Sequence, residues 1–338
     1  MNFKSSFLIT FTCLLYNFSN YAQDEISSNN NLLDMKKILG NDSITILVTD
    51  SGLGGMSVCA GIENKLREIK SFKEVNLIYF NALPEKGKGY NQMPSLEIKA
   101  EVFNEALISM EEKFKPDLIM IACNTLSVVY PHTEFSRTAK TPVLGIVDFG
   151  VSMILSELKN SSSEIIILGT PTTINAGTHK QKLIDNGVNT SKVISQACPN
   201  LESKIQENPH SQNVITLIEQ YLCEAVQNLN DSNEQIIAAL CCTHYDFSKE
   251  IFQSVFDSLT NRKVLLLNPN ELMISAVVLE ENINKFNNCT IKVRVVSRAL
   301  INDSEKFAIS SLIKSFAPLS ALALESYEHD INLFEFLH

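Results

Sequence analysis

Two cysteines lie at the ends of apolar stretches in different halves of the chain, and each is followed by polar side chains. Cys123 follows the stretch 117–122, and Cys242 follows the stretch 236–240 with His244 close behind. Short apolar stretches that stop at polar residues are typical of buried parallel strands, whose carboxyl ends carry ligand-binding groups. A thiol with a pKa of about 8.5 can act as acid or base near neutral pH. The pair therefore indicates acid–base chemistry, whereas one thiol with His244 would suit hydrolysis or decarboxylation.

Two turns carry further polar groups at the ends of predicted strands. The Gly-rich turn 50–55 does not fit a dinucleotide, because the third Gly of that motif falls on Ser57 and an acidic residue opens the turn. It is better suited to placing N–H groups and Ser51 near a small anion, with Asp50 holding a neighbouring proton donor. The turn 169–174 offers Thr hydroxyls and free amides that suit a carboxylate, with simple helix capping as an equal alternative.

The composition is that of an ordinary globular protein. The 338 residues are 45% hydrophobic, and the net charge of −10 argues against nucleic acid and anionic membrane as partners. The 8 cysteines include no Cys-x-x-Cys pair, so neither a disulfide framework nor a zinc site is predicted. No motif for pyridoxal phosphate, metal or nucleotide occurs. We therefore predict no cofactor and a small molecule as the partner.

The succession of elements predicts an α/β protein. Each apolar stretch is followed by a helical pattern and none by a tight hairpin signal, which is the rhythm of doubly wound parallel sheets. The predicted strands are 43–49, 76–80, 117–122, 142–147, 164–168, 192–194, 236–240, 264–267 and 291–296. The predicted helices include 94–110, 211–229, 271–284 and 305–316. The amphipathic tail 319–338 is expected to pack on the first domain, with partner binding as the alternative.

The N-terminus has the pattern of a secretory signal. Lys4 precedes an apolar core at 7–16, and Ala22 provides a small residue before a cut. The core is too short to span a bilayer, which needs about 20 residues. Residues 1–22 are therefore predicted to be a signal peptide and 23–43 a flexible lead-in. The expected location is secreted, in the periplasm, with an uncleaved N-terminal anchor as the alternative.

Six short stretches occur in the order of a known family and cover roughly residues 44–316. They are 50–55, 122–125, 142–146, 169–170 with Thr173, 198–199, and 242–245. With them the chain resembles the cofactor-independent aspartate/glutamate racemases, and the glutamate racemases among them most closely. The resemblance implies two similar doubly wound parallel-sheet domains that face each other across a cleft. The first would be 44–144 completed by 262–338, and the second 145–261.

The resemblance also implies a role for each matching residue. Cys123 and Cys242 would be the acid and the base on opposite faces of the α-carbon, with Asp50 assisting Cys123 and His244 assisting Cys242. The residues that would hold the amino-acid substrate are Ser51, Asn124, Thr125, Thr170, Thr173 and Thr243. One thiol must be a thiolate while the other is protonated, and the roles exchange for the opposite enantiomer. The implied activity is racemisation of an amino acid, with glutamate or aspartate favoured.

The chain departs from the family pattern around the substrate side chain and behind the histidine. Residues 81–82 are Asn-Ala where the family carries Asp-Thr, and the loop that follows contains Lys86 and Lys88. Gln206, with Glu207 beside it, stands where the family has the Glu that supports the histidine. If the two lysines reach the site, they favour a substrate with a side-chain carboxylate. Support for the histidine could come from either Gln206 or Glu207.

Two alternatives to a racemase stay open. One is a thiol-dependent hydrolase or decarboxylase of the same fold, and the other is a catalytically silent periplasmic amino-acid-binding protein. Retention of both thiols weighs against the first, because a single nucleophile needs no second cysteine. The sequence predicts no membrane partner for the mature form, and it does not decide between a monomer and a homodimer.

Overall fold

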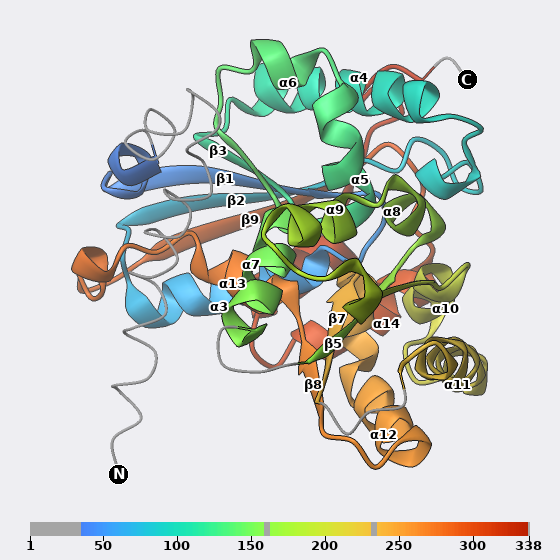
Figure 1. The fold of residues 1–338 in the computed structure, drawn as a ribbon. Coiled ribbons are helices and arrows are strands. Elements are labelled where there is room, and N and C mark those ends of the chain that lie inside the picture. Colours follow the sequence, from blue (N-terminus) through green and yellow to red (C-terminus); the bar gives the residue numbers. More distant parts are fainter. Residues whose placement is uncertain (1–34, 159–162, 231–234, 337–338) are drawn as a thin grey trace.

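Two parallel β-sheets form the frame of the molecule. The computed structural model describes residues 35–158, 163–230 and 235–336 (Figure 1). The first sheet has six strands in the order β10-β9-β2-β1-β3-β4, and the second has four in the order β6-β5-β7-β8. The strands are β1 (Ser43–Asp50), β2 (Glu74–Asn81), β3 (Leu118–Ile121), β4 (Val143–Gly145), β5 (Glu164–Gly169), β6 (Val193–Ala197), β7 (Ile236–Cys241), β8 (Val264–Leu267), β9 (Thr290–Ser297) and β10 (Glu328–His329). The predicted α/β fold class with two sheets is confirmed.

Helices cover the sheets and connect their parallel strands. The α-helices are α3 (Met56–Ile69), α4 (Leu96–Phe114), α5 (Asn124–Val129), α6 (Phe135–Thr138), α7 (Ile146–Leu158), α8 (Pro171–Ala176), α9 (Thr178–Asp185), α10 (Leu201–Glu207), α11 (Gln212–Gln227), α12 (Lys249–Leu259), α13 (Pro269–Ser275), α14 (Asp303–Ile313) and α15 (Pro318–Glu325). The 3-10 turns are η1 (Tyr90–Gln92), η2 (Tyr130–His132), η3 (Thr190–Lys192), η4 (Thr243–Ser248) and η5 (Glu280–Asn282). Among the residues that the structure describes, no helix is long and apolar enough to cross a membrane.

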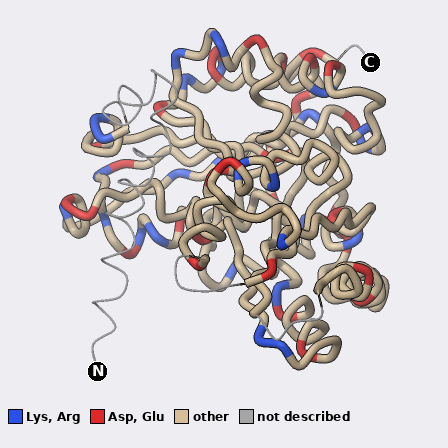
Figure 2. Tube along the Cα trace, in the orientation of Figure 1, with Lys and Arg blue, Asp and Glu red and all other residues tan. Residues whose placement is uncertain are grey.

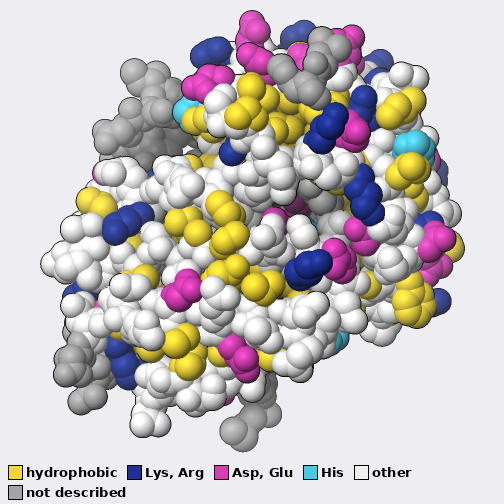
Figure 3. Space-filling view, turned by 90° about the vertical axis from the view of Figure 1, so that its right-hand side faces the viewer, with side chains coloured by type: hydrophobic (Ala, Val, Ile, Leu, Met, Phe, Trp, Pro, Cys, Tyr) yellow, Lys and Arg dark blue, Asp and Glu magenta, His cyan; other side chains and the backbone are white. Residues whose placement is uncertain are grey.

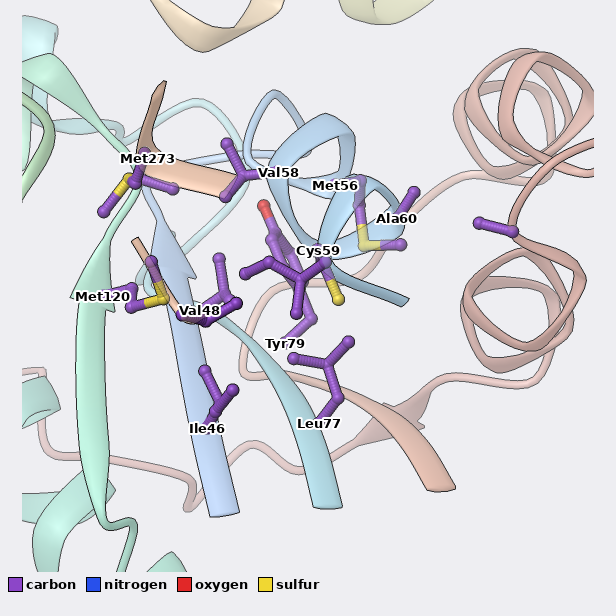
Figure 4. Close-up of a cluster of buried hydrophobic side chains, with 14 of the residues drawn as sticks. Ile46, Val48, Met56, Val58, Cys59, Ala60, Leu77, Tyr79, Met120 and Met273 are labelled. Carbon is purple, nitrogen blue, oxygen red and sulfur yellow. The ribbon is translucent and has the colours of Figure 1, made fainter. Parts of the chain in front are cut away.

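The first sheet is buried on both faces because its central strand is apolar on both. Ile46 and Val48 of β1 belong to the core under α3, whereas Leu47, between them, belongs to the core under α4. Figure 4 shows the α3 side, where Cys59 points into a cluster of apolar side chains from β1, β2 and β3. Burial raises the pKa of the Cys59 thiol to about 12. This cysteine is therefore a packing residue.

The second sheet is covered in the same way by helices on its two faces. Residues of α11 and α12 pack on one face of β7, together with Cys242, and residues of α7 and α9 pack on the other, together with Cys241. Adjacent residues of a strand point to opposite faces, so the two cysteines lie on opposite sides as their order predicts. Lys/Arg and Asp/Glu are interspersed along the trace in Figure 2.

Three predicted elements differ in the structure. The strand predicted at 142–147 ends at Gly145, and a helix starts at Ile146, whose N–H donates to Ser127 Oγ at 3.1 Å. The strand at 264–267, which we placed with the first domain, pairs with β7 in the second sheet, so the chain crosses back after residue 267 rather than at 262. The helix predicted over 271–284 ends at Ser275. Its remaining apolar side chains are buried in the first core as a loop.

The C-terminal tail packs on the first sheet, as predicted. Helix α15 lies against α14 and β9, and β10 adds an edge strand beside β9. Leu333 and Phe334 are buried in the core under α4, and Phe80 contacts Phe334 with ring centroids 5.9 Å apart. The end of the chain therefore completes the first sheet and the core on one of its faces.

Candidate active site

The two predicted thiols meet at one cavity between the sheets. Cys123 follows β3, and Cys242 follows β7, so each comes from the carboxyl end of an inner strand of its own sheet. The cavity has a volume of about 20 Å³ and is lined by Asp50, Ser51, Asn91, Cys123, Asn124, Thr125, Thr170, Glu202, Cys241, Cys242, Thr243 and His244. That is room for about one water molecule, so an amino acid can enter only if the lining residues move apart. A larger hollow of about 640 Å³ lies along α4 and α6, away from both thiols.

Cys123 is connected to Asp50 through Ser51. Its Sγ lies 3.3 Å from Ser51 Oγ and accepts from Leu126 N at 3.4 Å at the start of α5. Asp50 Oδ1 accepts from Ser51 N at 2.5 Å, and Oδ2 accepts from Thr243 Oγ1 at 2.6 Å. Burial, and then the Asp50 charge, raises the pKa of the Cys123 thiol, which is therefore protonated at neutral pH. Asp50 thus acts on Cys123 by its charge and through Ser51.

Cys242 has a histidine as its partner, and the geometry fixes the tautomer of that histidine. His244 Nδ1 lies 3.8 Å from Cys242 Sγ, and Nε2 lies 3.1 Å from Gln206 Oε1. The main-chain N–H of Leu53 also donates to Gln206 Oε1, at 2.8 Å, which identifies that atom as the amide oxygen. An oxygen can only accept here, so His244 carries its proton on Nε2. Its Nδ1 lone pair is then free to accept the proton of the Cys242 thiol.

Burial sets the resting protonation of this second pair. It lowers the pKa of His244, although the Asp50 charge opposes the change, and it raises the pKa of Cys242. At neutral pH the pair is therefore a neutral imidazole beside a protonated thiol. Glu207 forms its ion pair with Lys204 at 2.7 Å, on an exposed part of α10. The support of His244 thus comes from Gln206.

The glycine-rich turn between β1 and α3 lets the main chain come close to His244 and Gln206. A Cβ added at Gly54 would collide with His244 Nδ1 and Thr243 Oγ1, and one added at Gly52 would lie 2.9 Å from Gln206 Oε1. The turn was expected to bring N–H groups and Ser51 close to a small anion. Its Leu53 N–H donates to Gln206 Oε1, and Ser51 lines the cavity. The expectation that Asp50 holds a proton donor is met by the Thr243 hydroxyl.

The remaining predicted residues form one cluster of hydrogen-bonding groups. Thr125 Oγ1 lies 2.8 Å from Thr170 Oγ1, and Thr170 in turn lies 3.1 Å from Thr173 Oγ1 and caps α8. Asn124 Oδ1 lies 3.2 Å from His179 Nε2, and its Nδ2 is buried without a partner. The hydroxyls and this free N–H are suited to a carboxylate. The structure therefore brings together all ten predicted site residues, since Thr173 joins the set through Thr125 and Thr170.

Three further residues belong to the site, and no pattern in the sequence marks them. His179 fixes the orientation of the Asn124 amide across 55 positions, and burial lowers its pKa to about 4. Glu202 and Asn91 line the cavity, and Asn91 Nδ2 donates to Glu202 Oε1 at 3.4 Å. Glu202 comes shortly after the family stretch 198–199, but no motif includes any of the three residues, so only the fold shows their position.

The two loop lysines do not reach the cavity. Lys86 Nζ lies 3.8 Å from Glu305 Oε2, and Lys88 Nζ lies 3.0 Å from Glu85 Oε2. Both lysine side chains are more than half exposed, at 53% and 55%. The expectation that these cations select an acidic substrate required them to reach the site, and they do not reach it.

Comparison with known proteins shows the family to which the chain belongs. The sequence profile of the family Asp/Glu/Hydantoin racemase matches residues 54–277, and the chain belongs to this family. It is therefore an isomerase of the amino-acid racemase class.

Individual relatives carry the name glutamate racemase. The one from Streptococcus agalactiae is 29% identical over 214 residues, which is 63% of this chain and 74% of the relative. The one from Campylobacter jejuni is 26% identical over 239 residues, 70% of this chain and 86% of the relative. A crystal structure of a glutamate racemase from Bacillus anthracis superposes with a TM-score of 0.62 at 21% identity, covering 81% of this chain and 95% of that one. This last likeness shows the shared fold.

The comparisons correct the predicted location. The prediction of a secreted, periplasmic protein is wrong, because the proteins that the chain matches are glutamate racemases, a cytoplasmic class of enzyme. The segment 1–22, on which that prediction rested, lies outside the described residues.

Proposed function

We propose that the protein inverts the α-carbon of a free amino acid with Cys123 and Cys242 as the two acid–base groups. The observation that carries this is the meeting of the two thiols at one cavity, from the strand ends of different sheets. Each thiol has its own partner, Ser51 with Asp50 for one and His244 for the other. A single nucleophile would not need this duplication.

The reaction divides into removal of a proton on one face and delivery of a proton on the other. In one direction Cys242 transfers its proton to His244 Nδ1, and the thiolate then takes the α-hydrogen as a proton. The electron pair left on the α-carbon delocalises into the α-carboxylate, where the Asn124 amide and the threonine hydroxyls can stabilise the added charge. The Cys123 thiol then protonates the opposite face. In the other direction Cys123 is the base and Cys242 the acid.

Substrate binding helps to form the thiolate. Burial and nearby negative charge raise the pKa values of both thiols. An α-ammonium group brought into this cavity adds a positive charge, which favours a thiolate beside it. Glutamate, named for the relatives, is the reference substrate for assays of this protein.

The test is exchange of the α-hydrogen in heavy water together with chiral chromatography. The expected result is an amino acid that incorporates deuterium at the α-carbon and becomes racemic without any other change. Release of carbon dioxide or of an acyl fragment would instead identify a decarboxylase or a hydrolase. Binding without exchange for every amino acid tested would identify a silent binding protein and reject the proposal.

A further inference from the structure

Glu202 is an acidic residue of the cavity that the proposed two-thiol reaction does not use. The residue lies in the first turn of α10 and lines the cavity with Cys123 and Cys242. Its Oε1 accepts from Asn91 Nδ2 at 3.4 Å, whereas Oε2 is buried without a partner in hydrogen-bond geometry. An unpaired buried carboxylate oxygen is costly, so a ligand group that donates to it is bound favourably. The side of the molecule on which α10 lies in Figure 1 faces the viewer in Figure 3, where acidic side chains are visible within a central hollow.

The other polar groups of the cavity already have partners or a role in the reaction. The threonine cluster and the Asn124 amide form the donor set for the α-carboxylate. Asp50 has both oxygens occupied, by the main-chain N–H of Ser51 and by the Thr243 hydroxyl. Glu202 and its neighbour Asn91, from the loop before α4, therefore remain as the groups that can meet the substrate side chain.

The charge of the cavity lining favours one class of substrate. Among the described residues that line it, Asp50 and Glu202 are acidic, and none is Lys or Arg. A side-chain carboxylate of a substrate placed beside Glu202 would meet another carboxyl group and no Lys or Arg of the lining. A cationic side chain would instead pair with the free oxygen of Glu202 and favour its ionised form, against the rise in the Glu202 pKa that burial causes. Building on the proposed racemase function, we propose that Glu202 is a specificity-determining residue and that it selects α-amino acids with a cationic side chain.

The experiment compares substrates on three forms of the full chain. Values of kcat/KM for α-hydrogen exchange are measured with ornithine, lysine, glutamine and glutamate on wild type, Glu202→Gln and Glu202→Val. On wild type the better of ornithine and lysine should exceed glutamate by at least about tenfold, the size expected for one charge-assisted hydrogen bond. Glu202→Val should reduce that ratio about 10- to 100-fold by removing the bond and admitting an acidic side chain.

The variant Glu202→Gln and one further variant, Glu207→Gln, separate selectivity from folding. Glu202→Gln keeps the volume of the side chain and an oxygen for Asn91, so it should fold like wild type while losing the cationic preference. Glu207→Gln is the matched control, because this exposed residue of the same helix pairs with Lys204. It should leave every kcat/KM within about twofold.

The outcomes distinguish the inference from the function on which it rests. A wild type that prefers glutamate, or that shows no preference, overturns the role of Glu202 while the racemase function stands. An equal loss with all four substrates in Glu202→Gln also overturns it, because the carboxylate would then bind the shared α-ammonium group. Absence of exchange with any amino acid rejects the two-thiol function, and the inference with it.

Discussion

The ends of β3 and β7 each carry a cysteine, but the two cysteines have different kinds of partner. Cys123 caps an α-helix and is linked through Ser51 to the Asp50 carboxylate, all within the first sheet and its connections. Cys242 is followed by a 3-10 turn, and its partner is a neutral imidazole two positions further on. That imidazole is held by Gln206 of the second half and, through it, by Leu53 of the first. One thiol therefore has a local anionic partner, and the other has a neutral partner assembled across the cavity.

This difference indicates that both thiols are necessary, and that different neighbouring groups control how each one gains and loses its proton. A fixed carboxylate close to Cys123 adds to the cost of forming a thiolate there. The His244 tautomer, by contrast, depends on contacts between the two halves, so closing of the cavity and readiness of Cys242 as a base are coupled. We expect changes behind Cys242 to alter the pH dependence, and changes behind Cys123 to alter stability.

The largest expected effect is the loss of either thiol. Cys123→Ala and Cys242→Ala should each reduce kcat/KM for racemisation by at least about 100-fold, because general acid–base catalysis contributes on that scale. Chiral chromatography of the product gives the rate, and circular dichroism checks the fold. Cys59→Ala is the matched control, since this thiol is buried in an apolar cluster and does not line the cavity. Near-normal turnover in either active-site variant would show that the reaction does not need both thiols.

The second prediction concerns stability on the Cys123 side, where buried His179 holds Asn124. Burial lowers the His179 pKa from 6.5 to about 4. Between about pH 6.5 and pH 4, His179 is therefore protonated in the unfolded chain and neutral in the folded chain. The stabilising contribution is full above that pH and is lost as the pH falls towards 4. Between about pH 7 and pH 5, wild type should lose about 2 kcal/mol more of its free energy of unfolding than His179→Gln.

Urea unfolding at the two pH values measures this difference. Comparing each protein with itself cancels the cost of the substitution at neutral pH. His210→Gln, at an exposed position, is the control and should lose as much as wild type. Equal losses in wild type and His179→Gln would show that the buried histidine is not the acid-sensitive group.

The third prediction concerns the pKa of His244, the partner of Cys242. In Gln206→Glu a carboxylate replaces the neutral amide beside His244 Nε2, which favours the imidazolium and raises the pKa of His244. His244 must be neutral to accept a proton from Cys242, so activity should disappear at a higher pH as the solution is acidified. The acid limb of the kcat/KM profile should move up by about 1 pH unit. Glu207→Gln should leave the profile in place, and an unmoved limb in Gln206→Glu would mean that His244 does not receive the proton.

The residues that could be predicted are those marked by local patterns. Cys123 and Cys242 each stand where an apolar stretch meets polar residues, and that boundary is visible in a window of a few positions. The parallel sheets followed for the same reason, because strand and helix patterns alternate along the chain. The match of short stretches to a known family then attached roles to positions that the patterns had only singled out.

The residues that could not be predicted depend on contacts between distant segments. His244 and Gln206 are 38 positions apart, and the choice between Gln206 and Glu207 was decided by which side of α10 faces the cavity. The start of α7 at Ile146 depends on the Ser127 hydroxyl of another helix. Such contacts have no signature in the neighbouring residues, so only the packed structure shows them.

The smallest effect is expected from the lysines of the loop on the Cys123 side. Lys86 and Lys88 are more than half exposed and pair with Glu305 and Glu85, so their charges are screened by water and by their partners. The double variant Lys86→Ala/Lys88→Ala should keep kcat/KM and the ratio of acidic to neutral substrates within about twofold of wild type. Asn91, further along the same segment, lines the cavity. The substrate preference of Asn91→Ala therefore tests whether this segment determines specificity through Asn91. A change of preference in the lysine variant with none in Asn91→Ala would place the selecting charge on the loop surface, and the substrate would then be acidic.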